Sequence, residues 1–115
     1  MPLARLVLLP AVVLGFVAVR SGWTKADEVT PIEVTLKDHR FLPAEIHVPS
    51  GRRADLRIHN QDTTAEEFDS SALKVEKVIA AGSSAIIHLR PLGPGRFPFM
   101  GELHSATAQG VVVAE

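Results

Sequence analysis

Short runs of alternating apolar and polar residues, each bounded by turn residues, most limit how this chain can fold. Residues 32–36 read Ile-Glu-Val-Thr-Leu, and residues 54–59 repeat the pattern as Ala-Asp-Leu-Arg-Ile-His. Alternation of this kind puts one face of a strand in a core and the other in water. Similar short runs occupy residues 45–48, 66–69, 74–79, 84–90, 96–100 and 110–114. The pattern predicts about seven or eight strands and no helix of any length.

Glycine and proline separate these runs, as in Pro49-Ser50-Gly51 and Gly93-Pro94-Gly95. The full length of 115 residues allows one domain. Many short strands in one domain predict an all-β fold, an antiparallel β-sandwich with Greek-key links. The chain has no cysteine, so the sandwich must rest on its apolar core, and no thiolate is available for a metal or for catalysis.

The first 26 residues have the pattern of a secretory signal. Arg5 precedes an apolar stretch from Leu6 to Val19, which is shorter than the roughly 20 apolar residues of a membrane span. We therefore expect a signal peptide over residues 1–26 and one exported domain over residues 27–115. An uncleaved signal that tethers the domain to the membrane is the alternative.

The charge of residues 27–115 excludes some classes of function. All 13 acidic side chains of the chain lie in this part, whereas Arg5, Arg20 and Lys25 lie before it. A net acidic domain without Lys/Arg runs has no basic patch to neutralise phosphates, so nucleic-acid binding is not expected. No G-x-S-x-G or H-E-x-x-H motif occurs, which argues against a hydrolase, and no small organic substrate is evident.

Several segments, taken in their order and spacing, resemble the small bacterial cupredoxin-like domains. They are residues 41–51 (FLPAEIHVPSG), 60–62 (NQD), 66–68 (EEF), 80–83 (AAGS), 91–97 (PLGPGRF), 99–104 (FMGELH) and 110–113 (GVVV). The resemblance covers essentially all of residues 27–115 and implies a cupredoxin-like sandwich. Copper cupredoxins have a histidine just before the Glu-Phe pair, a cysteine about three residues before a second histidine, and an axial methionine.

This chain departs from that ligand pattern. The resemblance places Glu66 at the first histidine, Gly101 at the cysteine and His104 at the second histidine, with Ala108 or Gln109 near the axial methionine. A blue-copper site depends on its thiolate. A plastocyanin-like electron carrier is therefore not expected.

Glu66 and His104 are the first candidates for metal ligands. Strand parity directs Glu66 inward beside Phe68, and a buried carboxylate must be protonated, paired or bound to a metal. In the alternative register Glu66 faces water, and Glu67 and Asp69 turn inward. Oxygen and imidazole donors suit iron, manganese or zinc, and they also hold Cu(II).

Three further residues complete the candidate metal set. Glu102 belongs to the loop of His104. Glu67 could add a second carboxylate, or it belongs to a solvated acidic face. Met100 could offer a thioether to Cu(I), or it packs at a strand end. Residues for which we expect surface roles are Glu76, His39, His47, His59 and His88.

Glycine at the cysteine position, within Phe99-Met100-Gly101-Glu102-Leu103-His104, is similar to the periplasmic cupredoxin subunit of Ftr-type bacterial iron uptake systems. That resemblance implies iron or copper as the bound ion and a role in oxidising ferrous iron or handing it over. It implies as partners a membrane permease, a periplasmic iron-binding protein and a polyferredoxin-like membrane protein. Two alternatives are an accessory ferrous iron oxidase that uses copper, and a metal-free docking module of a membrane complex.

Overall fold

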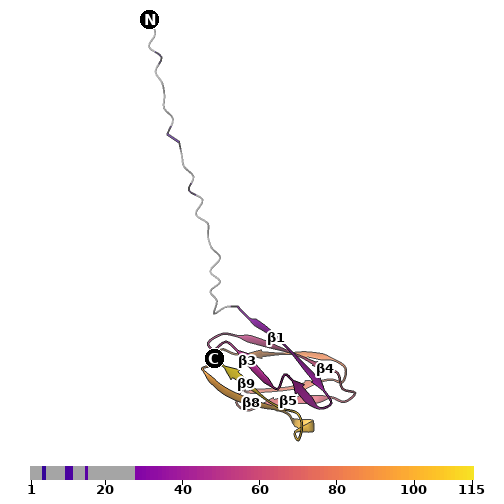
Figure 1. Cartoon of the computed structure of the whole chain (residues 1–115). Coiled ribbons are helices and arrows are strands. Elements are labelled where there is room, and N and C mark those ends of the chain that lie inside the picture. Colours follow the sequence, from indigo (N-terminus) through magenta and orange to yellow (C-terminus); the bar gives the residue numbers. More distant parts are fainter. Residues whose placement is uncertain (1–3, 5–9, 12–14, 16–27) are drawn as a thin grey trace.

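The computed structural model describes Ala4, Pro10, Ala11, Gly15 and residues 28–115. Residues 28–115 form two sheets that pack face to face, as Figure 1 shows. The expected signal peptide lies outside the described residues apart from those four positions, so it stays a prediction. In the part of the chain that is described, no helix has the length and apolar character needed to cross a membrane.

Within residues 28–115, nine strands build the sandwich, which confirms the predicted all-β fold. One sheet has the order β2-β1-β4-β7 and the other the order β3-β9-β8-β5-β6. The strand beyond the expected number is the three-residue β2, which is too short to show alternation. The strands are β1 (Thr30–Lys37), β2 (Arg40–Leu42), β3 (Glu45–Val48), β4 (Ala54–Asn60), β5 (Glu66–Ser70), β6 (Val75–Ile79), β7 (Ser84–Leu89), β8 (Gly95–Gly101) and β9 (Gln109–Ala114).

Two pairs of strands are parallel, which departs from the antiparallel prediction. β1 pairs with β4, and β3 pairs with the last strand, β9. For β1 and β4 the reason is the path of the chain. After β2 the chain crosses to the other sheet through Pro43 and Ala44, forms β3 there, and then returns to the first sheet as β4, beside β1. All other pairings are antiparallel.

The core lies between the sheets and follows the alternation of the strands. β4 buries Ala54, Leu56 and Ile58, and β5 buries Phe68. The rings of Phe68 and Phe99 are stacked with centroids 4.8 Å apart, and the ring of Phe41 meets both at steep angles. Such aromatic pairs stabilise a core beyond their burial alone, by about 0.5–1.5 kcal/mol each.

The topology brings several loops to one end of the sandwich. β1 and β4 run in parallel, with Leu36 paired to Asn60, so the segments that follow both strands lie at this end. β5 begins here, and β8 ends here in the 3-10 turn η2 (Glu102–His104). In Figure 1 this turn projects from the sandwich on the side away from the C-terminus.

Candidate metal centre

Glu66 is the first residue of β5, and its side chain points into the protein. The strand alternates between buried and partly exposed residues, and Glu66 is only 1 % exposed. The predicted inward direction of Glu66 beside Phe68 is confirmed. The alternative register, with Glu67 and Asp69 inward, is wrong, because a one-residue shift would expose Phe68.

Both oxygens of the Glu66 carboxylate have partners in the protein. Oε1 accepts hydrogen bonds from the backbone N–H of Leu103 (2.9 Å) and of Glu67 (3.0 Å). Oε2 lies 2.6 Å from Nδ1 of His104. The His104 side chain is 24 % exposed, so it covers the carboxylate and reaches solvent. The structure thus joins the two first-choice ligand candidates from β5 and η2.

The carboxylate of Glu66 takes the space in which a side chain at position 101 would lie. A Cβ atom added to Gly101 would be 2.5 Å from Cδ of Glu66 and 2.7 Å from Cβ of Ala108. The resemblance puts the copper-binding cysteine at position 101. A side chain at position 101 and the carboxylate of Glu66 would therefore compete for the same space.

His39, for which the sequence predicts a surface role, is a neighbour of the site. Its ring is stacked on the ring of His104, with centroids 3.6 Å apart and an angle of 12° between the planes. His39 belongs to the two-residue turn between β1 and β2, where Lys37 pairs with Arg40. The one sequence feature that could have pointed to His39 as part of the site is its position in a tight turn beside a strand end.

The carboxylate of Asp62 holds this turn. Its two oxygens accept hydrogen bonds from the backbone N–H of Asp38 (2.7 Å) and of His39 (3.0 Å). Burial raises the pKa of Asp62, but these two hydrogen bonds and the nearby imidazoles of His39 and His104 together lower it below its ordinary value. Asp62 therefore stays ionised and keeps the turn beside His104.

Glu102 lies apart from the Glu66–His104 pair, in a group with Glu67 and Glu76. One carboxylate oxygen from each of these three residues lies within 4.8 Å of the others. Desolvation raises the pKa of Glu67 above its ordinary value, and the carboxylates of Glu102, Glu76 and Asp69 raise it further. Two of the predicted ligands, Glu67 and Glu102, thus form an acidic group that is distinct from Glu66 and His104.

A comparison of the chain with known protein families identifies its family. The cupredoxin-like domain model matches residues 9–114. This chain belongs to the cupredoxin-like domain family. A relative, the uncharacterized protein RP394 of Rickettsia prowazekii (strain Madrid E), is 40 % identical over 87 residues, which cover 76 % of this chain and 70 % of the relative.

Solved structures with the same fold support this assignment. The metal-binding domain of the Streptococcus pneumoniae Cu(I)-exporting P-type ATPase CopA, with Cu(I), has a TM-score of 0.68 at 16 % identity, over 81 % of this chain and 90 % of that one. Auracyanin A, a "blue" copper protein from Chloroflexus aurantiacus, has a TM-score of 0.64 at 13 % identity, over 76 % of this chain and 100 % of that one. At such identities the likeness concerns the fold.

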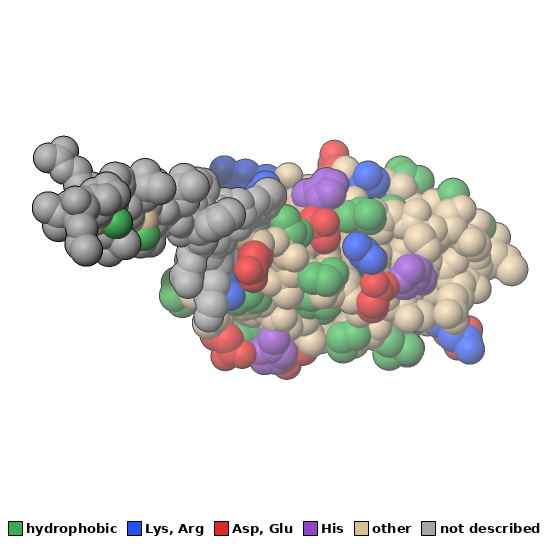
Figure 2. All heavy atoms as spheres, turned by 90° about the horizontal axis from the view of Figure 1, so that it is seen from above, with side chains coloured by type: hydrophobic (Ala, Val, Ile, Leu, Met, Phe, Trp, Pro, Cys, Tyr) green, Lys and Arg blue, Asp and Glu red, His purple; other side chains and the backbone are tan. Residues whose placement is uncertain are grey.

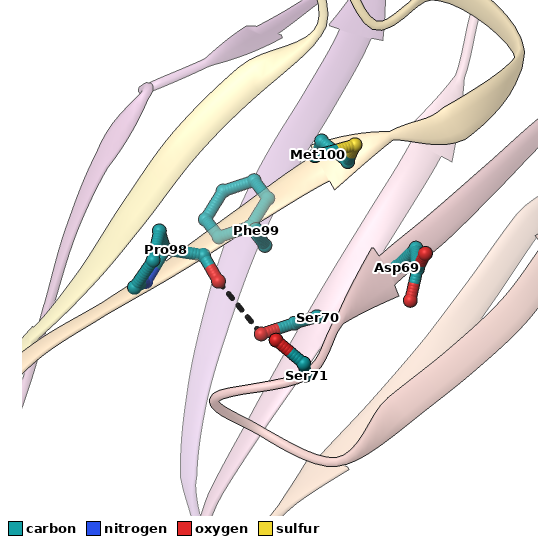
Figure 3. Close-up of a pocket in the computed structure, with 6 residues that line it drawn as sticks. All are labelled: Asp69, Ser70, Ser71, Pro98, Phe99 and Met100. Atoms are coloured by element: carbon teal, nitrogen blue, oxygen red, sulfur yellow. Dashed lines mark hydrogen bonds between the residues drawn. The ribbon is translucent and has the colours of Figure 1, made fainter.

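Met100, the last of the predicted ligands, lies on the outer side of this cupredoxin-like domain. It is 41 % exposed and pairs across the strands with Asp69. Figure 3 shows it beside a pocket of about 180 Å³, in which the Ser70 hydroxyl donates to the carbonyl of Pro98 (2.7 Å). No histidine lines this pocket, and its volume is below the roughly 300–1,000 Å³ of typical small-molecule sites.

The other three histidines lie on the outer faces, as the polar phase of their strands predicts. Each has a carboxylate at a ring nitrogen: Glu115 for His47, Glu33 for His59 and Asp55 for His88. Figure 2 shows one face, on which basic side chains are distributed among acidic, histidine and hydrophobic ones.

The group of Glu67, Glu76 and Glu102 leads to a prediction about the pH dependence of stability. Because the folded state raises the pKa of Glu67, ionised Glu67 opposes folding, and this loss of stability develops as the pH rises from the unfolded pKa through the folded one. We expect Glu67→Gln to raise the melting temperature at about pH 7 and to have no effect at about pH 3, where glutamates are protonated. Thermal unfolding at both pH values checks this. Glu28→Gln, outside the group, is the control, and equal effects at the two pH values would contradict the prediction.

Proposed function

We propose that this cupredoxin-like domain is an exported metal-binding protein of bacterial iron uptake. It binds ferrous iron at the loop end of the sandwich, helps to oxidise it or hands it to a membrane permease, and uses copper as the alternative or assisting metal. The observation that carries the proposal is the Glu66–His104 pair, joined at 2.6 Å at the end of the fold where the family resemblance puts the copper ligands.

The donors at this end do not fit a blue-copper ion. Gly101 offers no thiolate, and a side chain there would collide with Glu66. A carboxylate and an imidazole instead suit iron, manganese, zinc or Cu(II). Glu66 and His104 would hold the ion through Oε2 and Nδ1, the two atoms that now share a hydrogen bond. An iron or copper ion bound there would supply one-electron chemistry.

Backbone hydrogen bonds orient the Glu66 carboxylate for this role. Its Oε1 is fixed by the backbone N–H groups of Leu103 and Glu67, so Oε2 has a defined direction. Hydrogen bonds of this kind orient metal-binding carboxylates and contribute to metal affinity. His104 is the partly exposed cover of the pair and the point at which an ion enters or leaves.

The proposed partners are a periplasmic iron-binding protein, an iron-uptake permease and a polyferredoxin-like membrane protein. They follow from the resemblance to the Ftr-type subunit, as does the periplasmic location. The solved neighbours named above are copper proteins by their own descriptions, which supports metal binding by this fold. Iron as the cargo rests on the Ftr-type resemblance and on the oxygen and nitrogen donors.

Metal titration tests the proposal directly. The full-length chain, without a histidine tag and in a mild detergent, is titrated with Fe(II) under anaerobic conditions and separately with Cu(II). We expect stoichiometric binding that Glu66→Gln and His104→Ala each weaken at least about tenfold, as ligand and supporting groups generally do. His47→Ala is the matched control, because His47 also lies 2.6 Å from a glutamate, Glu115, but both are exposed.

A different outcome would favour the second candidate, a metal-free docking module. The observation behind this candidate is that, among the described residues, every buried side-chain nitrogen and oxygen already has a partner, including those of Glu66. Absence of saturable binding of either metal would overturn the metal-binding proposal and leave the docking module.

A further inference from the structure

We infer that His39 is the third metal ligand of the site, which gives a set of two imidazoles and one carboxylate with Glu66 and His104. The inference rests on the proposed function and specifies its metal. Two histidines and one carboxylate with open positions are the donor set typical of non-haem Fe(II) sites. His39 lies outside the four positions at which the family resemblance puts copper ligands.

The backbone at His39 is the first observation. Asp38 and His39 have φ values of 52° and 57°, as a two-residue hairpin turn of this type requires. Glycine adopts this conformation most readily, and it is uncommon for other residues, although Asn, Asp and His are enriched in it. A residue held in a disfavoured conformation beside a candidate site is a reason to look for a function there.

The support of the turn is the second observation. Asp62 accepts the N–H groups of both turn residues, and Asn60 in turn holds Asp62. The side-chain oxygen Oδ1 of Asn60 accepts the backbone N–H of Asp62 at 3.0 Å, and its side-chain nitrogen Nδ2 donates to backbone carbonyls, including that of Ile79 at 3.2 Å. Asn60 is only 2 % exposed. A buried polar network therefore fixes the backbone that carries His39.

The freedom of the His39 ring is the third observation. The other four histidines, all described, have a carboxylate at a ring nitrogen. Among the described residues, the ring of His39 forms a hydrogen bond with the Thr64 hydroxyl, at 3.4 Å from Nε2, which is a weak contact. His39 thus combines a fixed backbone with a ring held mainly by its stack on His104.

Ligation by His39 requires this ring to turn. The nitrogen lone pairs of two stacked rings lie in two nearly parallel planes, here with ring centroids 3.6 Å apart, so they cannot converge on one ion as they stand. The weak contact with Thr64 lets the ring leave the stack and meet an ion held by Glu66 and His104. A simpler role is that His39 only keeps the plane of His104 fixed by stacking.

Two variants separate ligation from stacking. His39→Phe keeps a flat ring against His104 and removes the nitrogens, whereas His39→Asn suits the turn backbone and removes the ring. We expect both variants of the full-length chain to bind Fe(II) at least about tenfold more weakly than the parent. With Cu(II) as the spectroscopic probe, electron paramagnetic resonance of the parent should show two coordinated imidazole nitrogens, and that of His39→Phe only one.

The outcomes distinguish the two proposals. Fe(II) affinity and a Cu(II) spectrum of His39→Phe equal to those of the parent would overturn the role of His39 as a ligand, as would a single imidazole in the loaded parent. If Glu66→Gln and His104→Ala still weaken binding in that case, the proposed function stands. If the parent binds neither metal, both proposals fail. The nitrogen count in the parent does not depend on the folding of any variant.

Discussion

Gly101→Ala should destabilise the protein by about 3 kcal/mol, at the upper end of the usual cost of overpacking a core. The new Cβ would lie 2.5 Å from Cδ of Glu66 and 2.7 Å from Cβ of Ala108. Backbone conformation is not the cause, because Gly101 has φ −88° and ψ 107°, which any residue adopts. Chemical denaturation measures the change. Gly93→Ala, with no atom within 4 Å of its added Cβ, should change the free energy of unfolding by less than about 0.5 kcal/mol.

A double-mutant cycle with Glu66→Ala tests whether the two positions are coupled. With the carboxylate removed, the same Gly101→Ala substitution should cost at least about 1 kcal/mol less, a coupling in the range found for residues in contact. The recovery should be partial, since the approach to Ala108 remains. Equal costs of Gly101→Ala in the two backgrounds would show that Glu66 and position 101 do not compete for space.

The strands and their register could be predicted because one face of each strand is buried. In β5, Phe68 can be buried only if Glu66 is buried as well, since the two residues lie two apart on the same face. The same parity explains why His47 and His88 lie in solvent. The parallel pairing of β1 with β4 could not be predicted in this way, because alternation does not specify which strands are neighbours.

The grouping of the candidate ligands depends on local geometry that the sequence does not display. Glu102 and His104 lie two residues apart, and the sequence suggested one ligand set. They fall in a 3-10 turn, where each residue advances by about 120°, so residues two apart point in different directions. Glu102 therefore lies with Glu67 and Glu76, and His104 with Glu66. His39 joins His104 only through the fold, from a turn in the other sheet.

Glu66→Ala should be the most damaging single substitution at this end of the protein, with a loss of about 3–5 kcal/mol, because it removes a large buried side chain together with the acceptor of buried hydrogen bonds. It removes the acceptor for the N–H groups of Leu103 and Glu67 and for Nδ1 of His104, and it leaves a cavity where a buried side chain lay. Glu66→Gln should cost less, because its amide oxygen can still accept both N–H groups. Equilibrium denaturation of the metal-free protein gives both values.

The control is Glu115→Ala, which breaks the exposed His47–Glu115 pair and should cost at most about 1 kcal/mol. Both pairs join a histidine Nδ1 to a glutamate oxygen at 2.6 Å, so they match in this contact and differ in burial and in the backbone hydrogen bonds of the glutamate. If Glu66→Ala costs no more than Glu115→Ala, the buried carboxylate is not what holds η2 against β5. If the large loss is found in the metal-free protein, Glu66 secures the loop before any ion binds, and an arriving ion meets the Glu66 carboxylate already in place. Such preorganisation lowers the ordering cost of binding.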